Sequence, residues 1–163
     1  MRVVVLSDTH IRDRGTRDLP VAAWRAVDDA DVVLHAGDVV EQGFLERLRD
    51  RASLHAVLGN NDHSLHGVLP EVWSGTVGGV RIAMIHDSGA RAGREGRMRR
   101  RFPDADLVVF GHSHVPWNAE GLDGQWLLNP GSPTERRGQP HRTIAILDLD
   151  AGAIRHSEIV VVD

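Results

Sequence analysis

The segment RVVVLSDTH, residues 2–10, carries the two patterns from which the architecture can be inferred. Its first part, residues 2–6, is a short apolar run of the kind that forms a central strand covered on both faces. Its second part places Asp8 and His10 directly after that strand. In open α/β sheets, ligands collect outside the carboxyl ends of the strands. We therefore expect a buried strand that delivers polar side chains to a site at the sheet edge.

The same pattern recurs in the following residues. Apolar runs at 30–37 and 53–60 indicate further buried strands. Apolar residues at helical spacing predict helices over 20–29 and 41–50, and Pro20 suits the first turn of the earlier helix. This β-α-β-α-β alternation predicts strands in one sheet that are connected by helical crossovers.

The second half of the chain is richer in strands. Residues 72–87 predict a hairpin that turns at Gly78 and Gly79, and a basic helix is expected near 91–101. A first half in which strands alternate with helices, followed by a second half with hairpins, predicts an α/β (α+β) fold of two facing mixed sheets flanked by helices. The remaining strands are predicted over residues 106–111, 125–132, 142–150 and 154–162.

The composition is that of an ordinary globular protein. The chain has 163 residues, 41% hydrophobic and 26% charged, which fits one domain, residues 1–163, with a sizeable core. The net charge of −4 gives no general attraction to nucleic acid, and no segment is long and apolar enough to span a membrane. Because the chain has no cysteine, any metal must be held by oxygen and nitrogen, and a cytoplasmic location is expected.

Potential metal ligands follow five of the predicted strands. They are Asp8, His10, Asp38, Asn60, His86, His112 and His114. Carboxylate and amide oxygens combined with imidazole nitrogens suit Mn²⁺, Fe or Zn²⁺ better than Ca²⁺. This set is too large for one tetrahedral ion but suffices for two ions if one carboxylate bridges them. Such a pair can clamp both oxygens of an in-line displacement at phosphorus, so the site is a candidate phosphate-ester hydrolase.

The motifs that carry these residues resemble those of the calcineurin-like metallophosphoesterases. DTH (8–10), GD (37–38), GNND (59–62), a single histidine and GHSH (111–114) occur in the family's order. NPGS (129–132) also occurs in the small single-domain phosphodiesterase branch of that family. The resemblance covers nearly the whole chain. It implies a four-layer α-β-β-α sandwich with a dinuclear metal centre at its edge.

The resemblance also implies how the ligands are shared between two divalent ions. Mn²⁺ is the expected metal, and Fe, Zn²⁺, Ni²⁺ or Co²⁺ are alternatives. A metal-bridging hydroxide would be the nucleophile, which excludes Ser132 from that role. By position, Asp8, His10 and His114 would hold one ion, Asn60, His86 and His112 would hold the other, and Asp38 would bridge them.

Asn61 departs from the pattern of larger family members, which carry a histidine directly after the ligand asparagine. A carboxamide cannot donate a proton as an acid at neutral pH. Esters with weakly basic leaving groups should therefore be favoured, unless His63 or a metal-bound water substitutes. Besides Asp38, we predict Asn61 and Asp62 as catalytic residues. The candidate substrate contacts are Asn61, His63 and Arg12, which lies just after the DTH motif.

Several other polar residues have two interpretations. Asp87 could orient His86 or cap the following helix, and the cap is favoured. The basic run within 91–101 could bind phosphate, but a solvated helix face is the default. Trp117 could border the site or pack in the core, and packing is favoured. His35 lies within a predicted strand and is interpreted as a packed or hydrogen-bonded residue rather than a ligand.

Two functions from different classes remain. The leading hypothesis is a metal-dependent phosphoesterase, specifically a phosphodiesterase acting on a small-molecule phosphate ester, with no membrane partner. The alternative is a non-catalytic metal-binding or protein-interaction scaffold on the same fold, the role of a retromer subunit within the family. A nuclease would need a long cationic groove, against which the acidic charge balance and the short chain argue. Homo-oligomerisation stays open.

Overall fold

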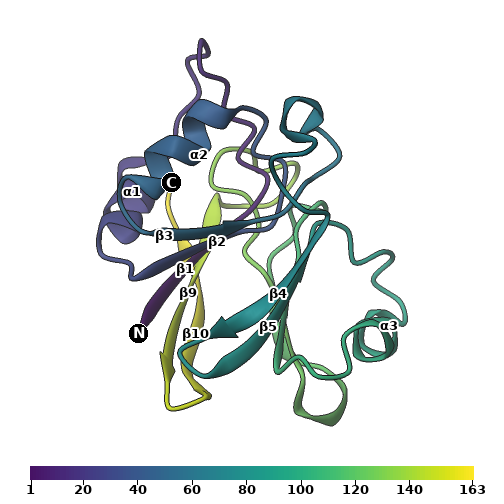
Figure 1. Ribbon diagram of the computed structural model, residues 1–163. Helices are drawn as coiled ribbons and strands as arrows, with labels where there is room; N and C mark the ends of the chain where they lie inside the picture. Colours follow the sequence, from purple (N-terminus) through teal and green to yellow (C-terminus); the bar gives the residue numbers. More distant parts are fainter.

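The first sheet is built around the apolar segment near the N-terminus. The structure, a computed structural model, describes residues 1–163 (Figure 1). In spatial order this sheet contains β10 (Ala153–Val161), β9 (Thr143–Asp150), β1 (Arg2–Leu6), β2 (Val32–His35) and β3 (Ser53–Ala56). β1, β2 and β3 run parallel, while β9 pairs antiparallel with both β1 and β10. The sheet is therefore mixed, and its central strand is the first one in the chain.

The second sheet is formed by the middle of the chain. In spatial order it contains β4 (Val72–Val77), β5 (Val80–Ile85), β6 (Leu107–Val109), β8 (Trp126–Asn129) and β7 (Trp117–Glu120). β5, β6 and β8 run parallel, and β4 and β7 are antiparallel edge strands. Both sheets are thus mixed, as predicted.

Alternating side chains of β1 explain why the sheets are stacked. Val4 and Leu6 belong to an apolar core that also contains residues of α1 (Val21–Asp28) and α2 (Gln42–Arg49). Val3 and Val5 point the other way, into a core shared with the second sheet. Full burial of one such side chain is worth about 1.5–3 kcal/mol relative to exposure. Both faces of the first sheet are therefore covered.

The outer face of the second sheet is covered by α3 (Arg94–Arg101), whose Met98 packs with Val108 and Phe110. Figure 1 shows α1 and α2 on one side of the molecule and α3 on the opposite side. This order of layers confirms the predicted α-β-β-α sandwich. No helix has the length and apolarity that crossing a membrane requires.

The observed elements differ from the predicted ones mainly at their ends. α3 starts at Arg94 instead of residue 91, because Gly93 adopts a left-handed conformation with φ of 70°. β2 ends at His35, two residues before the predicted end, since the chain there turns into a loop. The strand β7 was not predicted, because its sequence WNAE is short and half polar. Two 3₁₀ turns, η1 (His63–Leu65) and η2 (Leu122–Gly124), were not predicted either.

Candidate metal centre

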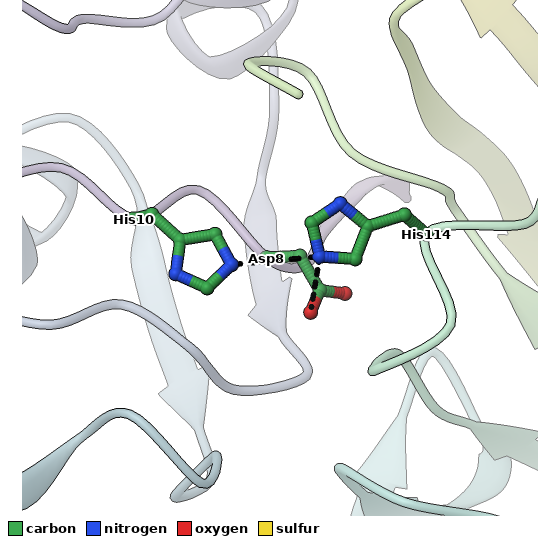
Figure 2. A group of neighbouring side chains, drawn as sticks. All are labelled: Asp8, His10 and His114. Atoms are coloured by element: carbon green, nitrogen blue, oxygen red, sulfur yellow. Dashed lines mark hydrogen bonds and ion pairs between the residues drawn. The ribbon is translucent and has the colours of Figure 1, made fainter. Parts of the chain in front are cut away.

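One group of donors joins the loop after β1 to the loop after β6. His10 and His114 are stacked with ring centroids 5.4 Å apart, and their Nε2 atoms lie 3.5 Å from each other. Asp8 Oδ1 lies 3.3 Å from Nε2 of His114. Figure 2 shows the Asp8 and His10 side chains, both from the loop after β1, beside His114 from the loop after β6. They form a set of one oxygen and two nitrogen donors that one cation could hold.

A second group lies beside the first and comes from the loops after β3, β5 and β6. Asn60 Oδ1 lies 3.1 Å from His86 Nε2 and 3.0 Å from His112 Nδ1. His86 is buried, whereas Asn60 and His112 are exposed. The donors of this group therefore face both the protein interior and the solvent, which would leave a substrate access to a cation held here.

Asp38 lies between the two groups. Its Oδ2 is 3.5 Å from His10 Nε2, and its Oδ1 is 3.6 Å from His86 Nε2. Each oxygen of Asp38 thus faces a different group, which is the position that a bridging carboxylate requires. Asp8 Oδ1 is also 4.0 Å from His86 Nε2, so the donors of Asp8, Asp38 and His86 form a set of their own. The structure brings all seven predicted ligands together. The carboxylate of Asp8, and not only that of the predicted bridging residue Asp38, lies close to donors of both groups.

The Asp8 carboxylate provides a test of whether a cation fits. Its Oδ1 atom is buried and accepts no hydrogen bond, although buried carboxylate oxygens are ordinarily paired. Its Oδ2 atom is satisfied by the Ser7 hydroxyl at 2.7 Å and by the backbone N–H of His112 at 3.0 Å. The unpaired oxygen is the one nearest to the Nε2 atoms of His86 and His114. A cation among these atoms would satisfy it, so the donor set fits a metal.

The protonation states also favour metal binding. Burial alone would raise the pKa of Asp8, but His114, His86 and the Ser7 hydroxyl outweigh burial and lower it below its usual value. Burial lowers the pKa of His10, and this effect outweighs the opposing pull of the Asp38 carboxylate. An ionised carboxylate and a neutral imidazole are the forms that bind cations.

The backbone at the ligand positions is strained. Positive φ angles, which non-glycine residues rarely adopt, occur at Asp8 (54°), His10 (47°), Asp38 (57°), His112 (68°) and His114 (57°). Each such conformation costs on the order of 1–3 kcal/mol and persists only where surrounding contacts enforce it. The loops are therefore held in a geometry that local propensity does not favour, as is common at functional sites.

Two glycines make the close packing of these loops possible. A Cβ atom on Gly111 would lie 1.8 Å from Ser7 Oγ and 2.7 Å from Asp8 Oδ2. A Cβ atom on Gly59 would lie 2.2 Å from both the backbone nitrogen and Oδ1 of Asp38. Any side chain at either position would displace a carboxylate of the centre. These contacts explain the glycine in the GNND and GHSH motifs.

Hydrogen bonds to the histidine rings fix which nitrogen faces the centre. His86 Nδ1 lies 2.7 Å from the carbonyl oxygen of Ala36, which can only accept, so Nδ1 carries the proton and Nε2 is free to bind a metal. His114 Nδ1 lies 3.4 Å from the carbonyl oxygen of Glu135, with the same consequence. Such partners orient metal-binding imidazoles and raise their basicity.

The segment that begins with NPGS supports the ligand loops through hydrogen bonds to their backbone carbonyl groups. The Ser132 hydroxyl donates to the carbonyl oxygen of Asp8 at 2.8 Å, and the Thr134 hydroxyl donates to that of Thr9 at 2.8 Å. Asn129 Nδ2 donates to the carbonyl oxygen of Gly111 at 2.9 Å. The sequence alone does not predict this bracing role, because a hydroxyl that braces a distant loop has no local signature.

Asp62 and Asn61 have different roles from each other. The Asp62 carboxylate is fully buried and accepts the backbone N–H groups of Asp38 (2.9 Å), Val40 (2.6 Å) and Gly59 (2.6 Å). Because both oxygens accept backbone N–H groups of the ligand loops, this geometry supports a positioning role for Asp62, and its catalytic role stays a prediction. Asn61, in contrast, donates directly to the Asp38 carboxylate.

The other predicted contacts are less closely tied to the centre. Arg12 borders a hollow that His10 and Asn61 also line, and its guanidinium lies 3.8 Å from Glu41. His63 is exposed in η1 and forms no hydrogen bond or ion pair with the seven donors, and its role as a substrate contact stays a prediction. Both predicted residues therefore lie outside the set of donors.

Asp87 has neither of its two predicted roles. Its Oδ1 accepts the backbone N–H of Gly89 at 2.7 Å and closes a turn, whereas α3 begins only at Arg94. The favoured interpretation as a helix cap was therefore wrong. The partner that orients His86 is instead the carbonyl oxygen of Ala36.

Trp117 and the basic helix pack against each other. The guanidinium groups of Arg91 and Arg94 lie over the Trp117 ring at 4.9 and 5.1 Å, and Arg94 is buried against Phe110. Trp117 is thus a packing residue, as favoured. The basic run is only partly a solvated face, since Arg97 Nε also donates to the carbonyl oxygen of Ser88 at 2.9 Å.

His35 is a packed and hydrogen-bonded residue, as interpreted from the sequence. It is fully buried, and its Nε2 atom lies 3.0 Å from the hydroxyl of Thr9. Burial lowers its pKa to about 3, against the opposing effect of the Asp8 carboxylate. His35 is therefore neutral at neutral pH and supports the loop between Asp8 and His10.

Comparisons with known proteins identify the family of the chain. A family model for the calcineurin-like phosphoesterase superfamily domain matches residues 1–152. A probable metallophosphoesterase of Methanothermobacter thermautotrophicus is 34% identical over 161 residues, covering 95% of this chain and 92% of that protein. A probable metallophosphoesterase of Bacillus subtilis, YsnB, is 30% identical, with 95% and 89% covered.

Solved structures share the fold at lower sequence identity. Vps29 of Chaetomium thermophilum superposes with a TM-score of 0.79 at 20% identity, covering 98% of this chain and 95% of that one. A conserved protein of Streptococcus pneumoniae, described as a predicted phosphoesterase, has a TM-score of 0.72 at 22% identity, with 98% and 88% covered. At these identities the likeness concerns the fold alone. Together with the family match over residues 1–152, the clustered donors and the sandwich architecture, this establishes that the chain belongs to the calcineurin-like phosphoesterase superfamily.

Proposed function

We propose that this protein is a phosphodiesterase that uses two divalent cations, with Mn²⁺ as the expected metal and Fe, Zn²⁺, Ni²⁺ or Co²⁺ as substitutes. The proposal is supported above all by the arrangement of donor atoms around Asp8 and Asp38. One buried oxygen of Asp8 lacks a partner, and the two oxygens of Asp38 face two separate groups of donors. In the proposed centre, Asp8, His10 and His114 hold one cation, Asn60, His86 and His112 hold the other, and Asp38 lies between them.

The metals would supply the part of the chemistry that the side chains cannot. When bound, two such cations lower the pKa of a water and neutralise the charge that builds on the phosphoryl oxygens. The residues of the chain fix the donors in place, through Ser7 on Asp8 and Ala36 on His86. This preorganisation means that little reorganisation is needed at the moment of reaction.

Asn61, at the position where larger family members carry a histidine, cannot act as the acid that protonates the leaving oxygen. Asn61 uses both its backbone N–H and its side-chain amide on Asp38, and a carboxamide does not titrate. General acid catalysis is typically worth about 10²–10⁴-fold in rate. We therefore propose that aryl esters, whose leaving groups are weakly basic, are hydrolysed faster than alkyl esters by a factor of this order.

Purified protein should hydrolyse bis(p-nitrophenyl) phosphate when Mn²⁺ is added and lose this activity in EDTA. Asp38→Ala should lower the rate by about 100-fold or more, since even partners of metal ligands are worth about 10–100-fold. Asp104→Ala, at an exposed carboxylate remote from the donors, is the matched control and should retain full activity. A higher kcat/KM for the diester than for p-nitrophenyl phosphate would support a diesterase over a monoesterase.

Two outcomes would contradict the proposal. One is the absence of turnover with each of Mn²⁺, Ni²⁺, Co²⁺ and Zn²⁺, and the other is full activity in Asp38→Ala. In the first case, binding of Mn²⁺ measured by titration calorimetry without turnover of any ester would favour the non-catalytic scaffold on the same fold. If the protein does hydrolyse the diester, two binding events in the same titration would support the dinuclear centre.

A further inference from the structure

Two separate hollows flank the proposed metal centre, and no residue lines both. The first has a volume of about 410 Å³ and reaches the centre at His10 and Asn61. The second has a volume of about 290 Å³ and reaches it at Asn60, His86 and His112. The centre therefore has an open space on each of its two sides.

The first hollow is polar and carries excess positive charge. Its charged lining residues, apart from the proposed ligand His10, are Arg12, Arg17 and Glu135, which give a net charge of +1, and its apolar lining is limited to Val40. The negative charge of Glu135 is shared, because this carboxylate pairs with both Arg17 and Arg137. The Arg12 side chain is 71% exposed and its partner Glu41 is 3.8 Å away, so its donors are largely free.

The second hollow has the opposite character. Its charged lining residues are Glu71, Asp87 and Arg101, which give a net charge of −1. Apolar side chains of Leu58 and Val72 also line it, together with Ile85. This hollow therefore suits an uncharged, partly apolar group and disfavours an anionic one.

A phosphodiester has two ester arms that leave the phosphorus in different directions. With the phosphorus at the metal centre, one arm would enter each hollow. We propose that the substrate is an asymmetric phosphodiester: one arm bears an anionic group, a carboxylate or a second phosphate, that lies against Arg12 and Arg17, and the other arm is uncharged and lies beside Leu58 and Val72. This inference rests on the proposed phosphodiesterase function. An arginine guanidinium can bind either anion through two parallel N–H groups.

The same charge pattern argues against a polynucleotide. A nucleic acid strand places a phosphate on both sides of the bond that is cut, and one of these would lie in the hollow that contains Glu71 and Asp87. Like charges at such close range are unfavourable. The inferred substrate is therefore a small molecule with one acidic end.

Two diesters that share a leaving group test this inference. p-Nitrophenyl 2-carboxyethyl phosphate and p-nitrophenyl propyl phosphate differ only in the carboxylate, and hydrolysis adds water across the P–O bond of each to release p-nitrophenol and a monoester. With Mn²⁺, the wild-type protein should favour the carboxylate ester by about 10-fold in kcat/KM, expressed mainly in KM, which corresponds to one charge-assisted hydrogen bond. Added NaCl should reduce this preference, because the arginines are exposed to solvent.

Substitutions in the loop after β1 provide the decisive comparison. Arg17→Gln should reduce the preference to about 2-fold or less, and Arg17→Glu should reverse it. Arg14→Gln is the matched control, since Arg14 is an exposed arginine of the same loop that does not line the hollow, and it should keep the wild-type preference. Thermal unfolding of each variant verifies that the fold is retained.

The two proposals fail in different ways. Hydrolysis of the propyl ester without any preference for the carboxylate ester would overturn this inference and leave the phosphodiesterase function intact. An unchanged preference in Arg17→Glu would do the same. Failure to hydrolyse either ester, or bis(p-nitrophenyl) phosphate, with any of the metals would overturn the phosphodiesterase function itself, and this inference with it.

Discussion

Asn61 holds both oxygens of Asp38: its backbone N–H donates to Oδ1 at 2.8 Å, and its side-chain amide donates to Oδ2 at 2.7 Å. These bonds fix the carboxylate that lies between the two groups of donors. Asn61→Ala removes the side-chain bond and keeps the backbone one. Since such partners are worth about 10–100-fold in metal affinity or activity, we expect Mn²⁺ affinity to fall within this range. Titration calorimetry measures the effect, and an unchanged affinity would remove Asn61 from the positioning of Asp38.

Asp62 should matter for stability even without metal. Its buried carboxylate accepts three backbone N–H groups, from Asp38, Val40 and Gly59. Asp62→Asn replaces one acceptor oxygen with an amide that cannot accept, so we expect the free energy of unfolding to fall by about 3 kcal/mol or more. Urea denaturation in EDTA measures this loss. The control is Asp104→Asn, a change at an exposed residue, which should alter the free energy of unfolding by about 0.5 kcal/mol at most. An equally small effect of Asp62→Asn would contradict the positioning role of Asp62.

His35 should make the protein sensitive to acid. Its pKa is lowered by burial from 6.5 to about 3, so below pH 6.5 the unfolded state takes up a proton that the folded state excludes. This group therefore costs no stability above pH 6.5, and between pH 6.5 and about 3 it lowers the free energy of unfolding by up to about 1.4 kcal/mol per unit of pH. His35→Gln places an amide where Nε2 meets Thr9 and removes the titration.

The measurement is the difference in unfolding free energy between wild type and His35→Gln across pH 4 to 8, recorded in EDTA. The variant should lose less stability than the wild type on going from pH 6.5 to pH 4. His66→Gln, at an exposed histidine, is the control and should keep the wild-type slope. Parallel pH profiles for all three proteins would show that the burial of His35 carries no such cost.

Ser132 should support the centre without acting as a nucleophile. Its hydroxyl donates to the carbonyl oxygen of Asp8 and accepts the backbone N–H of Glu135 at 3.0 Å. Ser132→Ala should lower the free energy of unfolding by about 1–2 kcal/mol and weaken Mn²⁺ binding, because the strained loop at Asp8 loses a brace. At saturating Mn²⁺, hydrolysis of bis(p-nitrophenyl) phosphate should stay within about 10-fold of the wild-type rate. Complete loss of turnover at saturating metal would instead assign chemistry to this hydroxyl.

The parts of the fold that follow from local pattern could be predicted from the sequence. The apolar run of β1 and the alternation of strands with α1 and α2 fixed the layers, because burial on both faces leaves a recognisable composition. β7 escaped prediction, since Trp117–Glu120 forms a strand only where it pairs with β8. Edge pairing of this kind depends on tertiary context more than on propensity.

The candidate site likewise has features that the sequence predicts and features that it does not. The positions of the donors after successive strands indicated that they converge, because the topology of such sheets gathers strand ends. The roles of Asp62 and Ser132 could not be inferred, since each depends on a hydrogen bond to a backbone group that only the folded chain brings near. The two hollows and their opposite charges likewise combine residues that are distant in sequence, such as Arg17 with Glu135.

Because β1 lies between β2 and β9, its part of the sheet can be completed only after β9 has been synthesised. β1 leaves the ribosome before its antiparallel neighbour β9 and before Ser132, whose hydroxyl donates to the carbonyl oxygen of Asp8. A nascent chain that ends before this point has the donors but not the frame that holds them. Stalled chains of that length should therefore retain no Mn²⁺, because the proposed centre can capture an ion only after β9 has been synthesised.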